Sequence, residues 1–317
     1  MAETRARNSP GNAPAIVVVG SMNTDLVTYV DRAPGPGETV IGTGFRSGFG
    51  GKGANQAIMA RLLGADVAFI GALGADPYAA QTLENFARFG IDASGVMRVG
   101  GPSGVAPIWV EANGTNRIIV VPGANDLITM EHALAAVVAL ERIDVCIGQL
   151  EIPQSVTAVA FHAARERGAI TILNPAPAAP IEPDLLAETD WLIPNEIEFG
   201  MLAEGAGDVT DAGLVAVATR TGTRLVVTLG ARGAALVSSD GSVTRIPGHT
   251  VAVVDTSGAG DAFVGGFSVG LGLGLTDLDA VRLGMGCASA SVTRPGTQAS
   301  FPRVEEAASI IGTFLRP

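Results

Sequence analysis

Short runs of apolar residues alternate along the chain with longer segments in which apolar residues recur every three or four positions. The runs that predict strands are Ile16–Gly20, Val67–Gly71, Val145–Gln149, Ile170–Asn174, Trp191–Pro194 and Leu225–Leu229. The segments that predict helices are Gly53–Leu63, Ala79–Phe89, Met130–Leu140, Pro153–Arg167 and Ala212–Thr221. Apolar strands that alternate with amphipathic helices are typical of a mostly parallel sheet with helices on both faces. The pattern therefore predicts a three-layer, doubly wound α/β fold.

Two stretches break this alternation with pairs of short strand-like pieces. Residues 23–50 contain Leu26–Val30 and Thr39–Thr43 around a Pro-Gly turn, and residues 104–121 contain Val105–Glu111 and Arg117–Val121. The second pair is joined near Asn113-Gly114, a strong hairpin signal. We expect the two stretches to form a small β lid beside the α/β body.

The remaining pattern completes the domain organisation. A further hairpin is expected at Leu236–Ile246, and two helices, Leu278–Thr293 and Val304–Leu315, are expected to close the chain. The first fourteen residues are polar, so we expect a disordered tail at residues 1–14 and one domain over residues 15–317. No signal peptide is expected, because no long apolar segment follows the tail.

Composition and charge narrow the class of protein. The 317 residues are 47% hydrophobic and 16% charged, as in a compact globular protein. The net charge is −11 and no basic stripe is visible, so no nucleic-acid partner is expected. No apolar run is long enough to span a membrane. The only two cysteines, Cys146 and Cys287, lie in apolar segments, which indicates buried free thiols and a cytoplasmic protein.

The stretch from Asp255 to Phe263 carries the clearest chemical signal. It joins the β-branched run Val251–Val254, a predicted strand, to an apolar segment that predicts a helix. The first turn of a helix presents free backbone N–H groups, and Gly258 and Gly260 would let a phosphate approach them closely. Asp261 then either accepts the proton of a hydroxyl that attacks a phosphoryl group or caps the helix. The stretch alone leaves both interpretations open.

A second glycine cluster, Gly48 to Gln56, also runs into a predicted helix. It contains G-x-G-x-x-G, but no buried strand is predicted before it, so dinucleotide binding is disfavoured. It is not a P-loop, because Gly53 follows Lys52. Lys52 and Asn55, with Asn23 and Asp25 upstream, offer the donors and acceptors that a polyol requires. Alternatively, Asn23 and Asp25 are only turn residues.

Five motifs in a fixed order resemble a known family over residues 15 to 303. They are Ser21-Met22-Asn23-Thr24-Asp25, Gly50-Gly51-Lys52-Gly53-Ala54-Asn55-Gln56, Pro194-Asn195-Glu196-Ile197-Glu198, Thr228-Leu229-Gly230-Ala231-Arg232-Gly233 and Asp255 to Asp261. Their order and spacing resemble the ribokinase-like (phosphofructokinase B type) carbohydrate kinases, and within that family the ribokinases most closely.

The resemblance implies a role for each motif. It implies that Asp261 is the catalytic base beside an anion hole of Gly258, Ala259 and Gly260. The residues it implies for the sugar hydroxyls are Asn23, Asp25, Gly51, Lys52, Asn55 and Glu151. Without the resemblance, Glu151 would equally well be a helix-start carboxylate before Pro153.

The resemblance also implies sites for ATP and two cations. It implies that Asn195 and Glu198 position Mg²⁺ through waters, although Pro-Asn-Glu alone would favour a helix cap. The residues implied for the nucleotide are Asn195, Thr228, Gly230, Gly233, Gly260 and Met285. Those implied for K⁺ are Asp255, Ser257, Ser291, Arg294, Gly296 and Ser300. Met285 departs from the family, which often has His or Asn there, so base selectivity is expected to be looser.

The activity that the resemblance implies is transfer of the ATP γ-phosphate to O5 of D-ribose by a homodimer joined through the β lid. A kinase of the same fold acting on deoxyribose, fructose or a nucleoside such as adenosine stays open. A nucleoside needs a platform for its base, for which Phe45, Phe49 and Trp109 are candidates. A non-catalytic sugar-binding regulator is disfavoured, because Asp261 and the anion hole are both intact.

Overall fold

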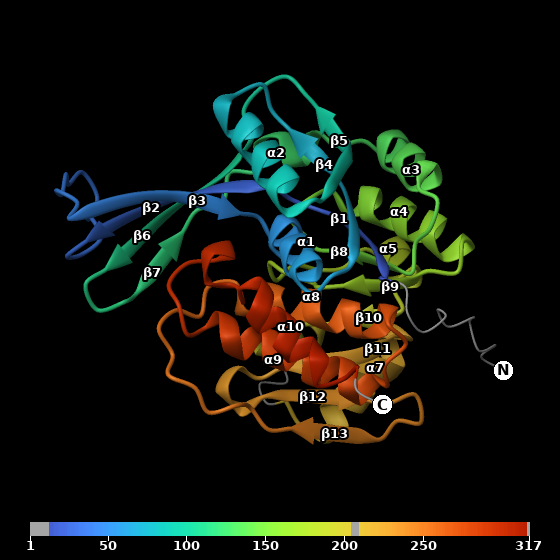
Figure 1. Cartoon of the computed structure of the whole chain (residues 1–317). Coiled ribbons are helices and arrows are strands. Elements are labelled where there is room, and N and C mark those ends of the chain that lie inside the picture. Colours follow the sequence, from blue (N-terminus) through green and yellow to red (C-terminus); the bar gives the residue numbers. More distant parts are fainter. Residues whose placement is uncertain (1–12, 204–208, 316–317) are drawn as a thin grey trace.

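The computed structural model describes residues 13–203 and 209–315, so the tail expected at residues 1–14 lies almost wholly outside the described residues. In the described chain nine strands form one sheet in the order β13-β12-β11-β10-β9-β8-β1-β4-β5 (Figure 1). The strands are β1 (Ala15–Val19), β4 (Asp66–Leu73), β5 (Asp92–Arg98), β8 (Val145–Gly148), β9 (Ile170–Leu173), β10 (Trp191–Leu192), β11 (Arg224–Thr228), β12 (Ala234–Val237) and β13 (Val243–Ile246). All neighbours pair in parallel except the hairpin strands β12 and β13.

Helices cover both faces of this sheet, and each face has its own apolar core. One core is shared with α1 (Lys52–Leu62), α2 (Pro77–Phe89), α8 (Ala259–Gly272), α9 (Asp277–Ser291) and α10 (Val304–Gly312). The other is shared with α3 (Met130–Ala139), α4 (Gln154–Glu166), α5 (Pro183–Ala187), α6 (Glu196–Leu202) and α7 (Asp211–Thr221). The predicted three-layer, doubly wound α/β fold is confirmed.

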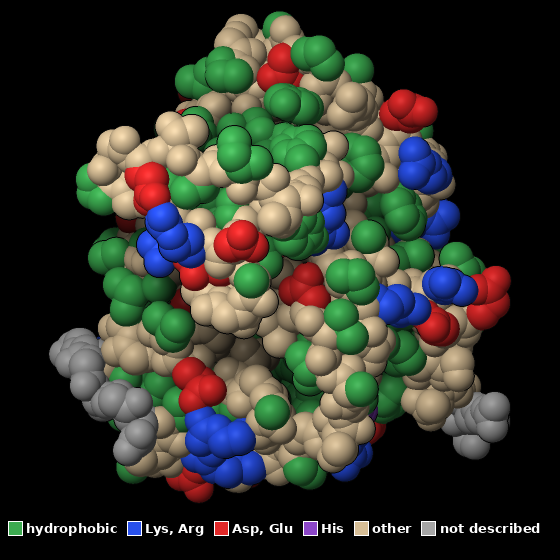
Figure 2. All heavy atoms as spheres, turned by 90° about the vertical axis from the view of Figure 1, so that its left-hand side faces the viewer, with side chains coloured by type: hydrophobic (Ala, Val, Ile, Leu, Met, Phe, Trp, Pro, Cys, Tyr) green, Lys and Arg blue, Asp and Glu red, His purple; other side chains and the backbone are tan. Residues whose placement is uncertain are grey.

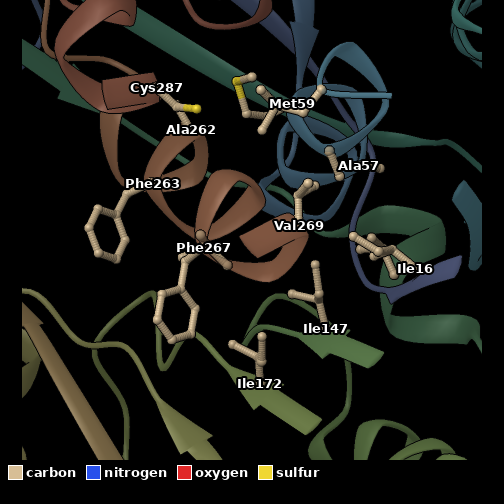
Figure 3. Close-up of a cluster of buried hydrophobic side chains, with 14 of the residues drawn as sticks. Ile16, Ala57, Met59, Ile147, Ile172, Ala262, Phe263, Phe267, Val269 and Cys287 are labelled. Carbon is tan, nitrogen blue, oxygen red and sulfur yellow. The ribbon is translucent and has the colours of Figure 1, made fainter. Parts of the chain in front are cut away.

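Helix α8 packs closely against its neighbours and fixes the position of its own N-terminus. Phe267 points from α8 toward the sheet, and its ring lies 5.0 Å from that of Trp191 (Figure 3). A Cβ on Gly265 would lie 2.7 Å from Cβ of Met59 on α1. A Cβ on Gly266 would lie 2.8 Å from Sγ of Cys287 on α9. The absence of side chains at these glycines therefore sets the spacing between the three helices.

A separate small sheet projects from the α/β body (Figure 1). Its strands, in the order β3-β2-β6-β7, are β2 (Asn23–Val30), β3 (Gly44–Gly50), β6 (Gly104–Glu111) and β7 (Asn116–Ile118). They come from the two stretches predicted to form a lid. The strand predicted at Thr39–Thr43 is wrong. β3 begins at Gly44 opposite Tyr29, one residue before the end of β2, so the residues before Gly44 have almost no partner strand left.

The strand predicted at Val251–Val254 is also wrong. Val253 and Val254 are each 61% exposed, and the segment lies in an irregular connection. The N–H of Val254 donates a 2.8 Å hydrogen bond to the carbonyl of Val292 at the end of α9. β-Branched residues favour strands through packing and pairing. In the described part of the chain, residues 251–254 are exposed and have no partner strand.

The cysteines and the helix lengths bear on the environment in which the protein works. Cys146 and Cys287 are buried and free, as predicted. None of the helices in the described ranges has the length and hydrophobicity that a membrane span requires.

Candidate active site

Asp261 occupies the third position of α8 and does not cap the helix. The cap is Gly258, in the left-handed conformation with φ of +76°, and no side chain among the described residues makes a capping hydrogen bond there. The Asp261 carboxylate instead accepts hydrogen bonds from Asn55 Nδ2 at 2.8 Å and Gln56 Nε2 at 3.0 Å, both from α1. The capping interpretation of Asp261 therefore fails, and its carboxylate faces a cluster of polar groups.

The surroundings of Asp261 tune its basicity. Burial raises the pKa of this carboxyl, and the Lys52 ammonium and the amides of Asn55 and Gln56 oppose that shift. The pKa of Lys52 is itself raised, since the attraction of Asp261, Glu151 and Glu198 outweighs burial. A buried carboxylate of raised pKa next to a lasting positive charge is suited to accepting a proton.

Asn23 and Asp25 lie on one face of β2 and point toward the same region. Asn23 is 4% exposed, and its Oδ1 accepts from Asn125 Nδ2 at 2.8 Å. A Cβ on Gly50, the last residue of β3, would collide with the Asp25 carboxylate. Burial raises the pKa of Asp25 to about 6, against an opposing hydrogen bond from Thr297. Both residues belong to a strand, so the interpretation of them as turn residues is wrong.

Glu151 ties the start of α1 to the end of the first strand. Its carboxylate accepts from the backbone N–H of Lys52 at 2.9 Å and from the hydroxyl of Ser21. Between them, Gly51 has φ of +87°, and a Cβ there would lie 2.7 Å from the backbone nitrogen of Asn23. Only glycine fits this crossing. The chain thus gathers the polar residues predicted for the sugar: Asn23, Asp25, Gly51, Lys52, Asn55 and Glu151.

Asn195 and Glu198 form a reciprocal capping box at the start of α6. Asn195 Oδ1 accepts from the N–H groups of Ile197 and Glu198, while Glu198 accepts from Asn195 N–H at 2.8 Å and Nδ2 at 2.9 Å. Burial raises the pKa of Glu198, opposed by Asn195 and Lys52. The helix-cap interpretation is therefore correct. With its oxygens already engaged, the pair fits an ion that brings its own waters, as Mg²⁺ does. No cluster of three or more His, Cys, Asp or Glu suited to a metal occurs in the described residues.

The turn after β11 lies beside this pair. Thr228 forms a β-bridge with Asn195, and its N–H donates to the Pro194 carbonyl at 3.0 Å. Gly230 and Gly233 have φ of +56° and +96°, conformations that favour glycine. Met285, by contrast, is only 5% exposed and belongs to the apolar core, so little of its thioether surface is open to a base.

Asp255 joins the two loops predicted to hold a monovalent cation. Its carboxylate accepts from the N–H of Ser257 at 2.9 Å and of Gly296 at 2.8 Å. Burial acts to raise the pKa of Asp255, but these hydrogen bonds prevail and lower it, so the group is charged. The other predicted ligands make local hydrogen bonds: Ser291 Oγ to Ala288 O, Ser300 Oγ to Thr297 O, and the Arg294 guanidinium to Ser300 O, Phe301 O and Glu306. A carboxylate between two backbone loops suits a monovalent cation.

The small sheet separates the predicted aromatic platform from the polar cluster. Side chains of directly paired residues share a face, and successive residues alternate between faces. Asp25 pairs with Gly48 and Ala106, whereas Trp109 pairs with Thr28. Phe45, Phe49 and Trp109 therefore lie on the face opposite Asp25 and do not line the same pocket.

Two residues of the site were missed in the sequence. Gln56 is fully buried against Asp261, and Arg46 of β3 lies on the same face as Asp25, where its charge lowers that carboxyl's pKa. A polar amide in an otherwise apolar helix segment could have indicated Gln56, because a buried amide needs partners. Nothing local distinguishes Arg46.

The molecule is hollowed on the face from which the small sheet projects (Figure 2). A different cavity of about 500 Å³ lies near the amino ends of β10 and β11, lined among others by Arg165, Asp190, Thr221 and Arg224. None of the predicted site residues lines it, so this cavity is separate from the candidate active site.

The protein has relatives over nearly its whole length. The family model that matches residues 13–304 is the pfkB family carbohydrate kinase. The ribokinase of Schizosaccharomyces pombe is 36% identical over 306 residues, covering 92% of this chain and 96% of that protein. The deoxyribokinase of Salmonella typhimurium is 35% identical over 300 residues, with coverage of 92% and 96%. The structure of Arabidopsis thaliana ribokinase complexed with ribose and ATP has a TM-score of 0.84 and 29% identity, covering 95% of this chain and 99% of the other. These matches agree with the geometry around Asp261, and this chain belongs to the pfkB family of carbohydrate kinases.

Proposed function

We propose that this carbohydrate kinase transfers the γ-phosphate of ATP to O5 of D-ribose, with Asp261 as the base. The observation that carries the proposal is the position of the Asp261 carboxylate. It stands beside the first N–H groups of α8 and in contact with Asn55, which belongs to the predicted sugar residues. The ribokinase relatives, one of them seen with ribose and ATP, support ribose as the sugar.

The residues around Asp261 divide the work of phosphoryl transfer. Asp261 accepts the proton of the attacking hydroxyl, while the amides of Gly258, Ala259 and Gly260 hold the negative charge of the phosphoryl group. Asn23, Asp25, Gly51, Lys52, Asn55 and Glu151 bind the sugar hydroxyls and orient O5. Thr228, Gly230 and Gly233 bind the nucleotide, and the base borders only the small exposed part of Met285.

Two cations complete the proposal. Asn195 and Glu198 would hold Mg²⁺ through waters, and the ion would neutralise charge on the ATP phosphates. Asp255, Ser257, Ser291, Arg294, Gly296 and Ser300 would hold K⁺ next to the anion hole. Their loops are already joined by the Asp255 carboxylate, which supports the assignment.

The small sheet acts as a lid over the sugar and as the interface of a homodimer. A lid that excludes water limits wasteful hydrolysis of ATP. We place the enzyme in the cytoplasm, where the buried free thiols of Cys146 and Cys287 stay reduced.

The test is the Asp261→Asn variant assayed for ribose-dependent ADP release. Loss of a positioned base should lower kcat by about 10² to 10⁴. Lys52→Met and Asn55→Ala should instead chiefly raise the KM for ribose. Near-normal turnover by Asp261→Asn would refute the assignment of the base.

Deoxyribose is the second candidate, favoured by the similarity to a deoxyribokinase at 35% identity. The two sugars differ by the 2-hydroxyl, and a site built to bind that hydroxyl discriminates strongly against its loss. The ratio of kcat/KM for ribose and deoxyribose decides between them. A nucleoside is disfavoured, because Phe45, Phe49 and Trp109 face away from Asp25.

A further inference from the structure

Each oxygen of the Asp261 carboxylate has its own amide donor from α1. Gln56 Nε2 donates to Oδ1 at 3.0 Å, and Asn55 Nδ2 donates to Oδ2 at 2.8 Å. The two oxygens therefore have the same kind of donor, and they are distinguished here by the groups that hold each amide.

The amide behind Oδ1 cannot turn round. Asn174 Nδ2 donates to the backbone carbonyl of Ile193 at 2.9 Å, and a carbonyl can only accept, so Asn174 must present its Oδ1 to Gln56. Gln56 therefore presents its NH₂ group to both Asn174 and Asp261, while its Oε1 accepts from Gln149 Nε2 at 2.7 Å. Gln56 and Gln149 are completely buried, which seals this end of the network from water.

The amide behind Oδ2 stands at the open end. Asn55 Oδ1 accepts from Gln298 Nε2 at 3.0 Å, and Gln298 in turn accepts from Asn85 Nδ2 at 3.0 Å. Gln298 is only half-buried, and Asn55 is one of the residues proposed to meet the sugar. A substrate hydroxyl can therefore replace the Asn55 donor at Oδ2, whereas nothing can replace the Gln56 donor at Oδ1.

We propose that Gln56 is a positioning residue for the base, and that it reserves Oδ2 of Asp261 as the oxygen that receives the substrate proton. The proposal rests on the proposed role of Asp261. As the substrate oxygen forms its bond to the γ-phosphorus, the bond from that phosphorus to the ADP oxygen breaks. ADP keeps that electron pair, and the hydroxyl proton moves to Oδ2.

Other charged groups also face Asp261, and they define what removal of Gln56 changes. Burial and Glu151 raise the pKa of Asp261, and Lys52 and the two amides oppose this upward shift. The negative charge of Asp261 also contributes to the raised pKa of Asp25 and of Glu198. Removing the Gln56 donor leaves all these groups in place and withdraws one of the three opposing influences.

The test is Gln56→Met, which keeps the length of the side chain and removes the donor. A hydrogen bond to a carboxylate favours its charged form, so the acid limb of the kcat–pH profile should move up by about one pH unit. We expect kcat at neutral pH to fall by about tenfold with the ribose KM within about twofold, since Gln56 is fully buried and is not one of the residues proposed to bind the sugar.

The matched control is Thr157→Val in α4, another buried polar group. The Thr157 hydroxyl is buried without a hydrogen-bond partner in the described chain, so its isosteric replacement should leave the pH profile unchanged. Gln56→Glu keeps the shape of the side chain, and it is the variant to measure if Gln56→Met does not fold. Two neighbouring carboxyls would share a proton, so its acid limb should move further up than that of Gln56→Met.

The outcomes separate this inference from the proposed function. If Asp261→Asn is inactive but the acid limb of Gln56→Met does not shift, the inference is overturned. The same holds for Gln56→Glu if Gln56→Met does not fold. An equal shift in Thr157→Val also overturns it, because the effect would then come from any disturbance of the core. An active Asp261→Asn enzyme refutes the proposed function itself.

Discussion

The Asp25 carboxylate is kept in the site at a cost to the folded state. Chiefly because of burial, its pKa is about 6 in the folded protein against 3.8 ordinarily. Between these pH values the folded protein binds a proton that the unfolded chain does not, so stability from this group rises as pH falls from about 6 toward 4. Above pH 6 the ionised carboxylate carries the whole penalty, up to about 3 kcal/mol.

Asp25→Asn should therefore gain stability relative to the unchanged protein at alkaline pH. We expect the difference in unfolding free energy between the two proteins to favour the variant more at pH 8 than at pH 4.5. Urea unfolding at the two pH values measures it. A difference that is independent of pH would show that Asp25 does not titrate in this range. The same variant should bind the sugar poorly, since Asn cannot accept as many hydrogen bonds as a carboxylate.

Burial chiefly determines the pKa of Asp25, and the charge of Arg46 partly offsets the upward shift. The Nε of Arg46 is buried without a hydrogen-bond partner in the described ranges, and the guanidinium charge lowers the pKa of Asp25. In Arg46→Met the pKa of Asp25 should rise above about 6, so Asp25 should become protonated at a higher pH. As the pH is lowered, the KM for ribose of this variant should therefore begin to increase at a higher pH than that of the unchanged protein. KM measured from pH 5.5 to 8.5 tests this. Arg117→Met is the control, because that cation of the small sheet pairs with Glu111 instead. The same displacement in both variants would exclude a specific role for Arg46.

Helix packing controls the site at the scale of elements. A Cβ on Gly265 of α8 would meet Met59 Cβ at 2.7 Å and the backbone oxygen of Gln56 at 2.9 Å. Gly265→Ala should therefore push α1 away from α8, lower stability by about 1 to 3 kcal/mol, and reduce kcat by separating Asp261 from its amide donors. Thermal unfolding and steady-state kinetics measure the two effects.

Gly200 in α6 provides the matched substitution. Among the residues that the structure describes, no atom beyond its own helix and chain neighbours lies within 4 Å of a Cβ there. Gly200→Ala should therefore stabilise the protein by about 0.5 to 1 kcal/mol through helix propensity. If both variants lose stability equally, close packing at Gly265 is not the cause.

The sequence predicted elements well where hydrophobic periodicity and pairing agree, and poorly where pairing alone decides. The buried strands and long helices follow from their apolar spacing. β3 does not, because it is a glycine-rich, mostly exposed strand whose limits come from its register with β2. The prediction for Val251–Val254 failed for the opposite reason, since its residues favour a strand but none of the described strands pairs with it.

At the scale of the whole molecule, the pattern of apolar residues predicted the layers of the fold but not which residues meet in the site. Asn55 and Asp261 meet across 206 residues of sequence, and only the family resemblance indicated that they belong together. Periodicity gives the layer in which a residue lies but not which strand ends are neighbours. The fixed orientation of Gln56 needed the coordinates, because it depends on Ile193 and Asn174, which no motif connects to it.

The surface of the small sheet is apolar in several places. Its strands and connections expose large apolar side chains: Ile41 at 88%, Phe45 at 67%, Ile118 at 55% and Ile119 at 49%. The register puts Ile118 on the same face as Asp25 and Phe45 on the opposite face. Exposed apolar side chains mark interaction surfaces, and the proposed homodimer would cover the face that carries Phe45. Light scattering after gel filtration should give a dimer for the unchanged protein and a monomer for Phe45→Asp.

Val138→Asp is the control for that experiment. Val138 is 63% exposed on α3, on the α/β body and outside the small sheet, so its replacement should leave the dimer intact. If the unchanged protein is a monomer at micromolar concentration, the exposed apolar side chains must be covered differently. If Phe45→Asp stays dimeric, the interface lies elsewhere on the molecule. A monomeric Phe45→Asp that retains the chemistry of Asp261 but hydrolyses ATP faster without sugar would show that dimerisation holds the lid closed.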